Sequence, residues 1–518
     1  MSVSDKGPDF SFVQKSEHPA LPVKKEKLKR HLIAKMEMPN SDKITEAGRK
    51  VVKETNIYSF ESSENWFEGI AKKVQRLTNL LNMIGGWILS VMRGGEACDE
   101  IRLLNGKHAI LNLAGAEHVQ MQSDTGYIVD AHYLDAAKFV ANLERLGGQR
   151  KTFQLEALPY AQRVFQPEGY GTVPDELAGE FSGFQFPENS ANTDEVIKIF
   201  NGMGGWNSNW GLITIRETLY LVPKDGFRKM GGYQWGTYGL KSNDVSDKPK
   251  KDEEKSAEDR GVVLLSQGLA VHYEGNLSEV LTFVLEGINV MAYNIPGNGM
   301  SQGPADQENI NASIEAAYHF LKEVKNIPDE KILAKGLCFG AAPTAWLGRK
   351  YPQINLMLDQ NPANFRDLMP KAVNMFADLV FPAGSKPEGI QEHFYSMVAN
   401  LVRDNSVIQG IAVAIFKGYD VATDLSYNEG HKLLHRDIPQ IDDQGLNVGG
   451  DELVPEHHPS LLLEAVKKIE GKEIYQTVNP GGAHGQAWWR HNADVKGPSC
   501  FDEVVRFLKE ADLKRELF

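Results

Sequence analysis

A regular alternation of short apolar runs and helical stretches dominates the chain from residue 261 onward. The apolar runs lie at 261–268, 288–293, 331–337, 354–359, 445–450 and 472–478. Helical stretches separate most of them, at 276–286, 307–325, 339–350, 459–470 and 500–513. Repeated strand–helix units require right-handed crossovers between parallel strands. The pattern therefore predicts an α/β domain with a mostly parallel sheet that helices cover on both faces.

One long interval, residues 361–444, breaks this alternation and is helical in pattern. In a sheet of this kind, ligands bind beyond the carboxyl ends of the strands. An insertion at this place would lie above that end, so we predict a helical lid. Its apolar residues, such as Phe376, Phe394 and Ile411, form either a small core of their own or the wall of an apolar substrate pocket.

The residues before 206 divide into two predicted regions. Residues 1–55 are polar and rich in Lys, which is typical of a flexible arm. Residues 56–205 are predicted to be a mainly helical or mixed region without a recognisable motif. Within it, the stretch 66–92 carries apolar residues at spacings of three and four, which predicts one amphipathic helix. That helix either faces a core or lies on a membrane surface. The α/β domain is accordingly predicted to span 206–518.

Composition narrows the class of protein. The net charge of −13 over 518 residues argues against nucleic-acid binding, because neutralising phosphates needs clustered Lys and Arg. The three cysteines, Cys98, Cys338 and Cys500, are far apart and odd in number, which favours a reducing compartment over a disulfide framework. The first ten residues lack the apolar core of a secretory signal. We expect a cytoplasmic location; export by a specialised secretion system and the oligomeric state are left open.

The segment KILAKGLCFGAAPTAW carries the strongest chemical signal. A short strand runs directly into Gly336-Leu337-Cys338-Phe339-Gly340, and a helix follows. A nucleophile elbow of the form G-x-nucleophile-x-G needs small residues on both sides of a strained turn, since the strand and helix backbones nearly touch. A helix N-terminus beneath the sulfur also favours the thiolate. We therefore predict Cys338 as a nucleophile rather than a buried structural cysteine.

A second segment, Gly299-Met300-Ser301-Gln302-Gly303, fits the same pattern with a serine. Here Pro296-Gly297 separates Ser301 from the preceding strand, and Pro304 follows where a helix should begin. The segment therefore reads as a loop at a strand end, and we do not expect Ser301 to be the nucleophile.

A catalytic triad needs an acid and then a histidine at the ends of later strands. Asp451 follows the predicted strand 445–450, and His484 lies in a glycine-rich loop after the last strand. His484 would take the thiol proton, and Asp451 would fix its tautomer. The rival acids are Asp442, Asp443 and Glu452.

The oxyanion hole and the metal content complete the predicted site. The backbone N–H groups of Phe339 and Leu269 are the expected oxyanion donors, with Ala270 as an alternative to Leu269. His457 and His458 are interpreted as residues of a helix start. The sequence shows no metal-spaced cluster, and we expect neither a metal nor a cofactor.

From about residue 205 onward the chain resembles the α/β-hydrolase superfamily. The run NVMAYNIPGNGMSQG resembles esterase-like members, in particular the chlamydial 43 kDa-protein hydrolase family, and the chain is similar in style to the SidB-type lipase-like effectors of Legionella. The G-x-C-x-G box around Cys338 resembles dienelactone hydrolases and polyhydroxyalkanoate synthases, which also use Cys, Asp and His. The resemblance implies hydrolysis of an ester, thioester or lactone of a small-molecule or lipid acyl substrate. An acyltransferase with the same triad and a catalytically silent binding or effector protein are the alternatives.

Overall fold

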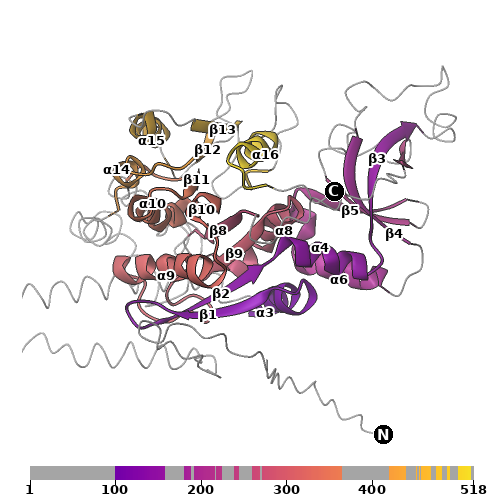
Figure 1. Ribbon diagram of the computed structural model, residues 1–518, viewed down its shortest axis with the longest axis horizontal. Coiled ribbons are helices and arrows are strands. Elements are labelled where there is room, and N and C mark those ends of the chain that lie inside the picture. The colour runs from indigo at the N-terminus through magenta and orange to yellow at the C-terminus, as the bar shows by residue number, and fades with distance from the viewer. Residues whose placement is uncertain are drawn as a thin grey trace, which may run out of the picture. The chain divides into compact units, whose positions relative to one another are not determined.

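The computed structural model describes a set of segments that begins at residue 100 (Figure 1). These segments are 100–157, 180–187, 192–215, 218–223, 238–243, 260–268, 271–364, 419–438, 451, 454, 457–467, 474–480, 487–489 and 500–514. All of them belong to one compact unit, Met38–Phe518. The predicted arm at 1–55, the predicted helix at 66–92 and Cys98 lie outside them.

An eight-stranded sheet lies at the centre of the α/β domain, in the order β1-β2-β9-β8-β10-β11-β12-β13. Its strands are β1 (Glu117–Gln122), β2 (Ile128–Leu134), β8 (Val262–Ser266), β9 (Asn289–Tyr293), β10 (Ile332–Leu337), β11 (Asn355–Asp359), β12 (Lys432–Ile438) and β13 (Ile474–Pro480). Strands β8 to β13 run parallel to one another, whereas β2 is antiparallel to both β1 and β9. The predicted parallel sheet is confirmed.

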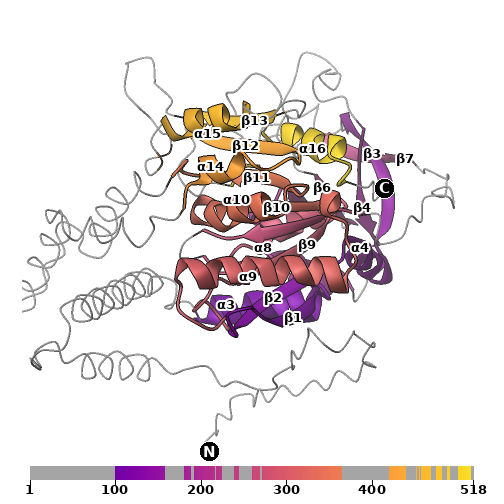
Figure 2. The ribbon, with the colours of Figure 1, turned by 60° about the vertical axis from the view of Figure 1, so that its left-hand side comes forward.

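Helices cover this sheet on both faces, as predicted (Figure 2). One face carries α4 (Ala136–Arg145), α8 (Leu277–Leu285) and α16 (Cys500–Glu510). The other carries α9 (Gln307–His319), α10 (Ala341–Lys350), α14 (Val421–Leu425) and α15 (His457–Lys467). Because successive side chains of a strand point to opposite faces, each strand contributes to both cores.

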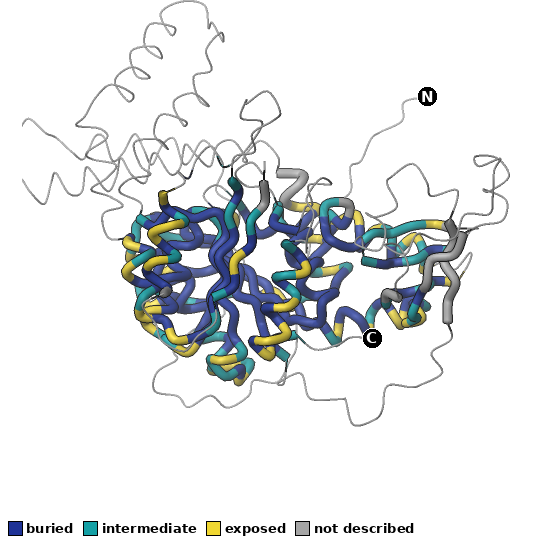
Figure 3. The backbone as a smooth tube through the Cα atoms, turned by 90° about the horizontal axis from the view of Figure 1, so that it is seen from above, coloured by how far each residue is buried: buried dark blue, intermediate teal, exposed yellow. Residues whose placement is uncertain are grey.

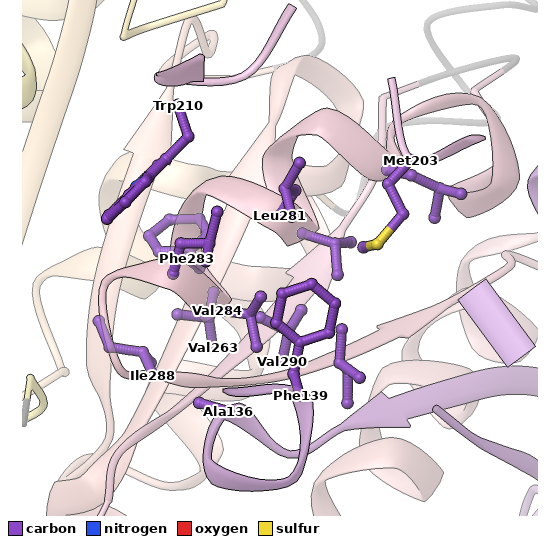
Figure 4. Close-up of a cluster of buried hydrophobic side chains, with 14 of the residues drawn as sticks. Ala136, Phe139, Met203, Trp210, Val263, Leu281, Phe283, Val284, Ile288 and Val290 are labelled. Carbon is purple, nitrogen blue, oxygen red and sulfur yellow. The ribbon is translucent and has the colours of Figure 1, made fainter. Parts of the chain in front are cut away.

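The two cores follow this alternation residue by residue. Val263 and Leu265 of β8 join the core under α8, whereas Val262 and Leu264 join the core under α9 and α10. Strands β8 and β9 are buried along their whole length. Figure 3 shows buried backbone, in dark blue, through the interior of the described part of the chain. Figure 4 shows Phe283 and its neighbours on α8 packed over the sheet. Each such side chain contributes roughly 1.5–3 kcal/mol through burial.

The predicted domain boundary at residue 206 does not coincide with this sheet. Strands β1 and β2 come from the predicted region 56–205, and β2 pairs with β9 through register partners such as Ala131 and Tyr293. The described part of that region also holds α3 (Glu100–His108) and α6 (Thr193–Gly202), so it is mixed α and β. The α/β sheet therefore recruits two strands from sequence that precedes its predicted start.

A second, antiparallel sheet takes up much of the remaining described sequence. It has five strands in the order β5-β6-β4-β3-β7. Its strands are β3 (Gln149–Ala157), β4 (Glu180–Phe186), β5 (Trp210–Ile215), β6 (Thr218–Pro223) and β7 (Tyr238–Asn243). Strands β5 and β6 form an antiparallel pair within this second sheet.

The predicted lid at 361–444 is too long at its C-terminal end. Residues 419–438 form α14 and β12, and β12 pairs in parallel with β11 and β13. The residues of the lid from 365 to 418, and the strand predicted at 445–450, lie outside the described residues. The strand in KLLHRDI was not predicted because four of its seven residues are charged or histidine side chains among the apolar ones.

Candidate active site

Cys338 lies at the turn between β10 and α10, where the sequence predicts a nucleophile. Its backbone has a φ of 52°, a left-handed conformation that costs a side-chain-bearing residue about 1–2 kcal/mol. Leu337 before it is still extended, and Gly340 after it already has helical angles. Strand, strained residue and helix thus follow one another within four residues. The thiol is partly exposed.

The two glycines of the box are fixed by close backbone contacts. A Cβ atom on Gly336 would lie 2.5 Å from the Ala341 Cα atom, and one on Gly340 would lie 2.1 Å from the Ser266 carbonyl oxygen. Neither contact can be relieved by rotating a side chain, because the obstacle is backbone. The turn therefore holds α10 against β10 and β8 at a distance that glycine alone permits.

The loop after β8 approaches Cys338 closely. A Cβ atom on Gly268 would lie 3.7 Å from the Cys338 Cβ atom, so this loop passes beside the elbow at van der Waals distance. Phe339 is buried and packs edge-on against Tyr419, with 6.1 Å between ring centroids. Leu269 and Ala270 lie outside the described residues. Phe339 follows Cys338 directly and Gly268 lies beside it, whereas the oxyanion donors stay a prediction.

Asp451 is positioned by a short hydrogen-bonded turn before α15. Its Oδ1 atom accepts a hydrogen bond from the Val454 N–H at 2.8 Å. Together with His435 and Asp437 it lines a cavity of about 390 Å³ at the carboxyl ends of β11 and β12. His484 and the rival acids Asp442, Asp443 and Glu452 lie outside the described residues. The contact between thiol, imidazole and carboxylate therefore stays a prediction.

Asp437 is a candidate acid that the sequence analysis missed. It is the penultimate residue of β12, it is buried, and its Oδ2 atom accepts a hydrogen bond from the Gln360 side chain. Asp437 was not among the predicted acids, because residues 432–438 were expected to belong to the lid. The assignment of β12 makes Asp437 a rival to Asp451.

A row of buried polar side chains runs under the elbow and was also missed. The Lys335 ammonium contacts a Glu279 carboxylate oxygen at 2.6 Å and an Asp359 oxygen at 2.9 Å. Burial works against the ammonium, but the charges of Asp359 and Glu279 outweigh it and raise the pKa of Lys335. The Trp488 indole N–H donates to Glu279 at 2.9 Å. This network ties α8 to β10 and β11.

His435 continues the row on β12. Its Nδ1 atom lies 2.7 Å from Thr477 Oγ1, and its Nε2 atom lies 4.0 Å from Asp359 and 3.8 Å from Asp437. Burial lowers the pKa of His435, more than the Asp359 charge raises it, so the ring is neutral at neutral pH. Register explains part of the row, because Asp359, His435 and Thr477 are paired across three neighbouring strands. A charged residue inside a predicted buried strand, as in ILAKGL, was the available signal.

The serine of the G-x-S-x-G segment at 299–303 has a structural role. Ser301 is buried; its hydroxyl accepts a hydrogen bond from the Asp130 N–H at 2.8 Å and donates one to the Asn294 carbonyl at 2.7 Å. Both bonds join β2 to the end of β9, so the prediction that Ser301 is not the nucleophile fits its surroundings. His457 and His458 begin α15, as predicted.

Sequence relatives match parts of the chain. No protein-family model matches it. An uncharacterised protein of Caenorhabditis elegans, F37A4.1, is 32% identical over 114 residues, which are 21% of this chain and 23% of that protein. The alpha/beta hydrolase domain-containing protein 17C of Xenopus tropicalis is 32% identical over 97 residues, which are 18% of this chain and 30% of that protein. The match thus spans less than a third of either relative.

Solved structures match more of the chain at lower identity. A Pyrococcus furiosus esterase, Pf2001, has a TM-score of 0.40 at 12% identity and covers 77% of this chain and 92% of its own. A bromoperoxidase of Bacillus anthracis has a TM-score of 0.31 at 18% identity and covers 48% of this chain and 92% of its own.

The strand order, with one antiparallel strand beside an otherwise parallel sheet, and the cysteine elbow after β10 decide the architecture. The chain has an α/β-hydrolase fold. In this α/β-hydrolase domain, the elbow, the β8 loop and Asp451 all lie beyond the carboxyl ends of parallel strands. Within the described segments, no group of His, Cys, Asp and Glu side chains could hold a metal ion. None of the helices described is long and apolar enough to cross a membrane.

Proposed function

We propose that this chain hydrolyses an ester, thioester or lactone through an acyl-cysteine intermediate on Cys338. The observation that carries the proposal is the left-handed backbone of Cys338 between β10 and α10. Strain at one residue persists only where the surrounding structure imposes it, and such residues gather at functional sites. The glycine contacts of the elbow provide that constraint.

In the proposed reaction, the Cys338 sulfur attacks the acyl carbonyl carbon while His484 accepts the thiol proton. The carbonyl π electrons move to oxygen, and the N–H groups of Phe339 and Leu269 bind the oxyanion. The bond to the leaving group then breaks, and His484 returns the proton to that group. Water, deprotonated by His484, attacks the acyl-cysteine and restores the thiol. Asp451, or Asp437 in its place, orients the imidazole.

The nucleophile also narrows the substrate class. A thiolate attacks well but is a good leaving group, so the tetrahedral intermediate collapses backward in competition with ester cleavage. Activated acyl groups such as thioesters and enol lactones are therefore the favoured substrates. The same property supports transfer of the acyl group to an acceptor other than water, which makes an acyltransferase the second candidate.

Covalent labelling tests the proposal. Iodoacetamide should modify Cys338, whereas burial and the nearby charges of Asp437 and Asp359 raise the pKa of Cys500 to about 12, which keeps that thiol protonated. Mass spectrometry of the labelled peptides separates the two sites. His484→Ala should slow labelling of Cys338 and abolish turnover of acyl-thioesters. A Cys338 that reacts no faster than Cys500, in a chain without turnover, would favour a silent binding protein.

Acceptor dependence separates the two enzyme classes. Hydrolysis requires no acceptor, so product should form from a p-nitrophenyl ester or an acyl-thioester in buffer alone. A transferase would release product only when an alcohol, amine or thiol acceptor is added. Comparing Asp451→Asn with Asp437→Asn in the same assay identifies the acid, since the acid should account for the larger loss of turnover.

A further inference from the structure

A second cavity, of about 880 Å³, lies among residues that have no part in the proposed catalysis. Its walls come from the end of α3 and the π-helical turn Ala109–Leu113, from the end of α6, and from the residues that begin α8. Its volume is in the range of small-molecule sites. The cavity thus joins the region before residue 206 to the first helix of the α/β-hydrolase domain.

The N-terminus of α8 opens into this cavity without a side-chain cap. Leu277 and Ser278 line the cavity, and within the described part of the chain their backbone N–H groups donate no hydrogen bond. Asn276 stands at the cap position, but its amide donates instead to Gln267 at 2.9 Å and to Glu279 at 2.8 Å. Uncapped N–H groups and the helix dipole favour an anion.

The hydroxyl of Ser278 is a second, independent sign of a ligand. Ser278 is 6% exposed and lines the cavity, yet its hydroxyl makes no hydrogen bond to any described residue. Two other buried hydroxyls of helices, those of Thr282 and Ser313, each donate to the carbonyl four residues earlier at 2.8 Å. Ser278 lacks such a bond, so a largely buried side chain presents its hydroxyl to the cavity with no acceptor among the described residues.

The charged groups of the cavity favour the same class of ligand. Lys198 of α6 lines it and carries a positive charge. The carboxyl of Glu274 is turned toward the end of β9, where it accepts a hydrogen bond from the Asn294 amide at 3.0 Å. The backbone carbonyl oxygen of Glu274 lies against Gly106, because a Cβ atom on Gly106 would lie 2.4 Å from that oxygen.

We propose that this cavity binds the oxyanion group, phosphate or carboxylate, of a small molecule. The donors are the N–H groups of Leu277 and Ser278, the Ser278 hydroxyl and the Lys198 ammonium. The site stands without the chemistry of Cys338. The Asn276–Gln267 hydrogen bond connects it to the loop that passes beside the elbow, so an occupied site would stiffen that loop.

Calorimetric titration of the full chain with inorganic phosphate and, separately, with acetate tests this proposal. Saturable binding of either ion is expected, and the ion that binds more tightly identifies the group. Lys198→Met should weaken that binding about tenfold, as expected for loss of a charge-assisted hydrogen bond. The matched control is Lys138→Met, because Lys138 is exposed on α4 away from the cavity and should leave binding unchanged.

Ser278→Ala provides a second test, since it removes one oxygen atom and should weaken binding several-fold in a chain that unfolds as the wild type does. Two results would overturn the proposal: no saturable binding of either ion to the wild-type chain, or an equal loss of affinity in both lysine variants. Neither result bears on labelling of Cys338, so failure here is distinguishable from failure of the proposed hydrolase.

Discussion

Two segments of this chain share a G-x-Ser/Cys-x-G pattern, and the structure places them in different surroundings. In the first, Ser301 is buried and its hydroxyl is bonded to the backbone of β2 and of the loop after β9. In the second, Cys338 is partly exposed in a left-handed turn between a strand and a helix. The pattern of small residues is the same, but the backbone on either side differs.

The difference lies in what the glycines do. Gly299 and Gly303 have positive φ angles of 52° and 93°, so they let a loop fold back on itself. Gly336 and Gly340 have ordinary angles, and their missing side chains make room for neighbouring backbone. The glycines of the elbow therefore serve close contact between a strand and a helix, whereas those of the loop serve left-handed backbone angles. The sequence pattern alone does not distinguish these two uses of glycine.

Removing the Cys338 sulfur and the Ser301 hydroxyl should separate the two segments most clearly. Cys338→Ala is expected to lower turnover of an acyl-thioester by about 10⁴-fold, because the covalent route is lost. Ser301→Ala should leave kcat/KM within about threefold of the wild type, since its hydroxyl serves the fold. Steady-state kinetics of both variants provides the measurement. A large loss in Ser301→Ala with unchanged stability would reverse the assignment.

Adding one methyl group should show by stability which glycine makes room for neighbouring backbone. Gly340→Ala is expected to cost about 3 kcal/mol or more, because its Cβ atom would overlap the Ser266 carbonyl at 2.1 Å. The matched control is Gly275→Ala, whose Cβ atom meets nothing within 4 Å. Urea unfolding of both variants provides the free energies. Equal values for the two would show that β8 and α10 can separate without cost.

The structural serine should matter for stability instead. Ser301→Ala leaves the buried Asp130 N–H without its acceptor, which we expect to cost about 1–3 kcal/mol. Ser426→Ala is the matched control, because its hydroxyl donates to the Thr423 carbonyl at an exposed site and its loss should cost under about 0.5 kcal/mol. Thermal and urea unfolding compare the two, and similar losses would contradict the structural role of Ser301.

The smallest expected effect is a pH dependence of the unfolding free energy that comes from Asp130, whose backbone N–H donates to Ser301. Burial raises the pKa of Asp130, but the hydrogen bond from His118 and the Lys107 charge outweigh it, so the pKa lies below the ordinary 3.8. A depressed pKa contributes stability that is fully present above the unfolded value and is lost as pH falls through the folded one.

The Asp130→Asn variant tests this dependence. The difference in unfolding free energy between wild type and variant should be constant above about pH 5 and should shrink below the ordinary aspartate pKa. A difference that persists unchanged in acid would mean that the carboxylate charge of Asp130 contributes nothing to the free energy of unfolding.

The fold was predictable where hydrophobic pattern and local chemistry agree. Strands β8 to β11 are apolar runs bounded by turns, and the helices between them have clear periods, so the parallel sheet follows from sequence. Strands β1 and β2 could not be assigned, because four of the six residues of β1 (EHVQMQ) are polar and its partner β2 pairs with a strand about 160 residues later. Pairing over such a separation leaves no local signal.

The candidate site was predictable only in part, for a related reason. The elbow is local, so Cys338, Phe339 and the glycines followed from one segment. The buried row of Lys335, Asp359 and His435 depends on the register of neighbouring strands, which sequence patterns do not specify. The same applies to Asp437, which became a candidate acid once KLLHRDI was found to be a strand.

The pairing of β2 with β9 has a practical consequence for the expression of fragments of this α/β-hydrolase domain. A fragment that begins at residue 206 would lack β1 and β2 and would leave the backbone N–H and C=O groups of β9 unpaired along one side. An apolar strand with an open edge is a template for intermolecular pairing. Such a truncation invites aggregation, whereas a start before Glu117 retains the ribbon that closes that edge.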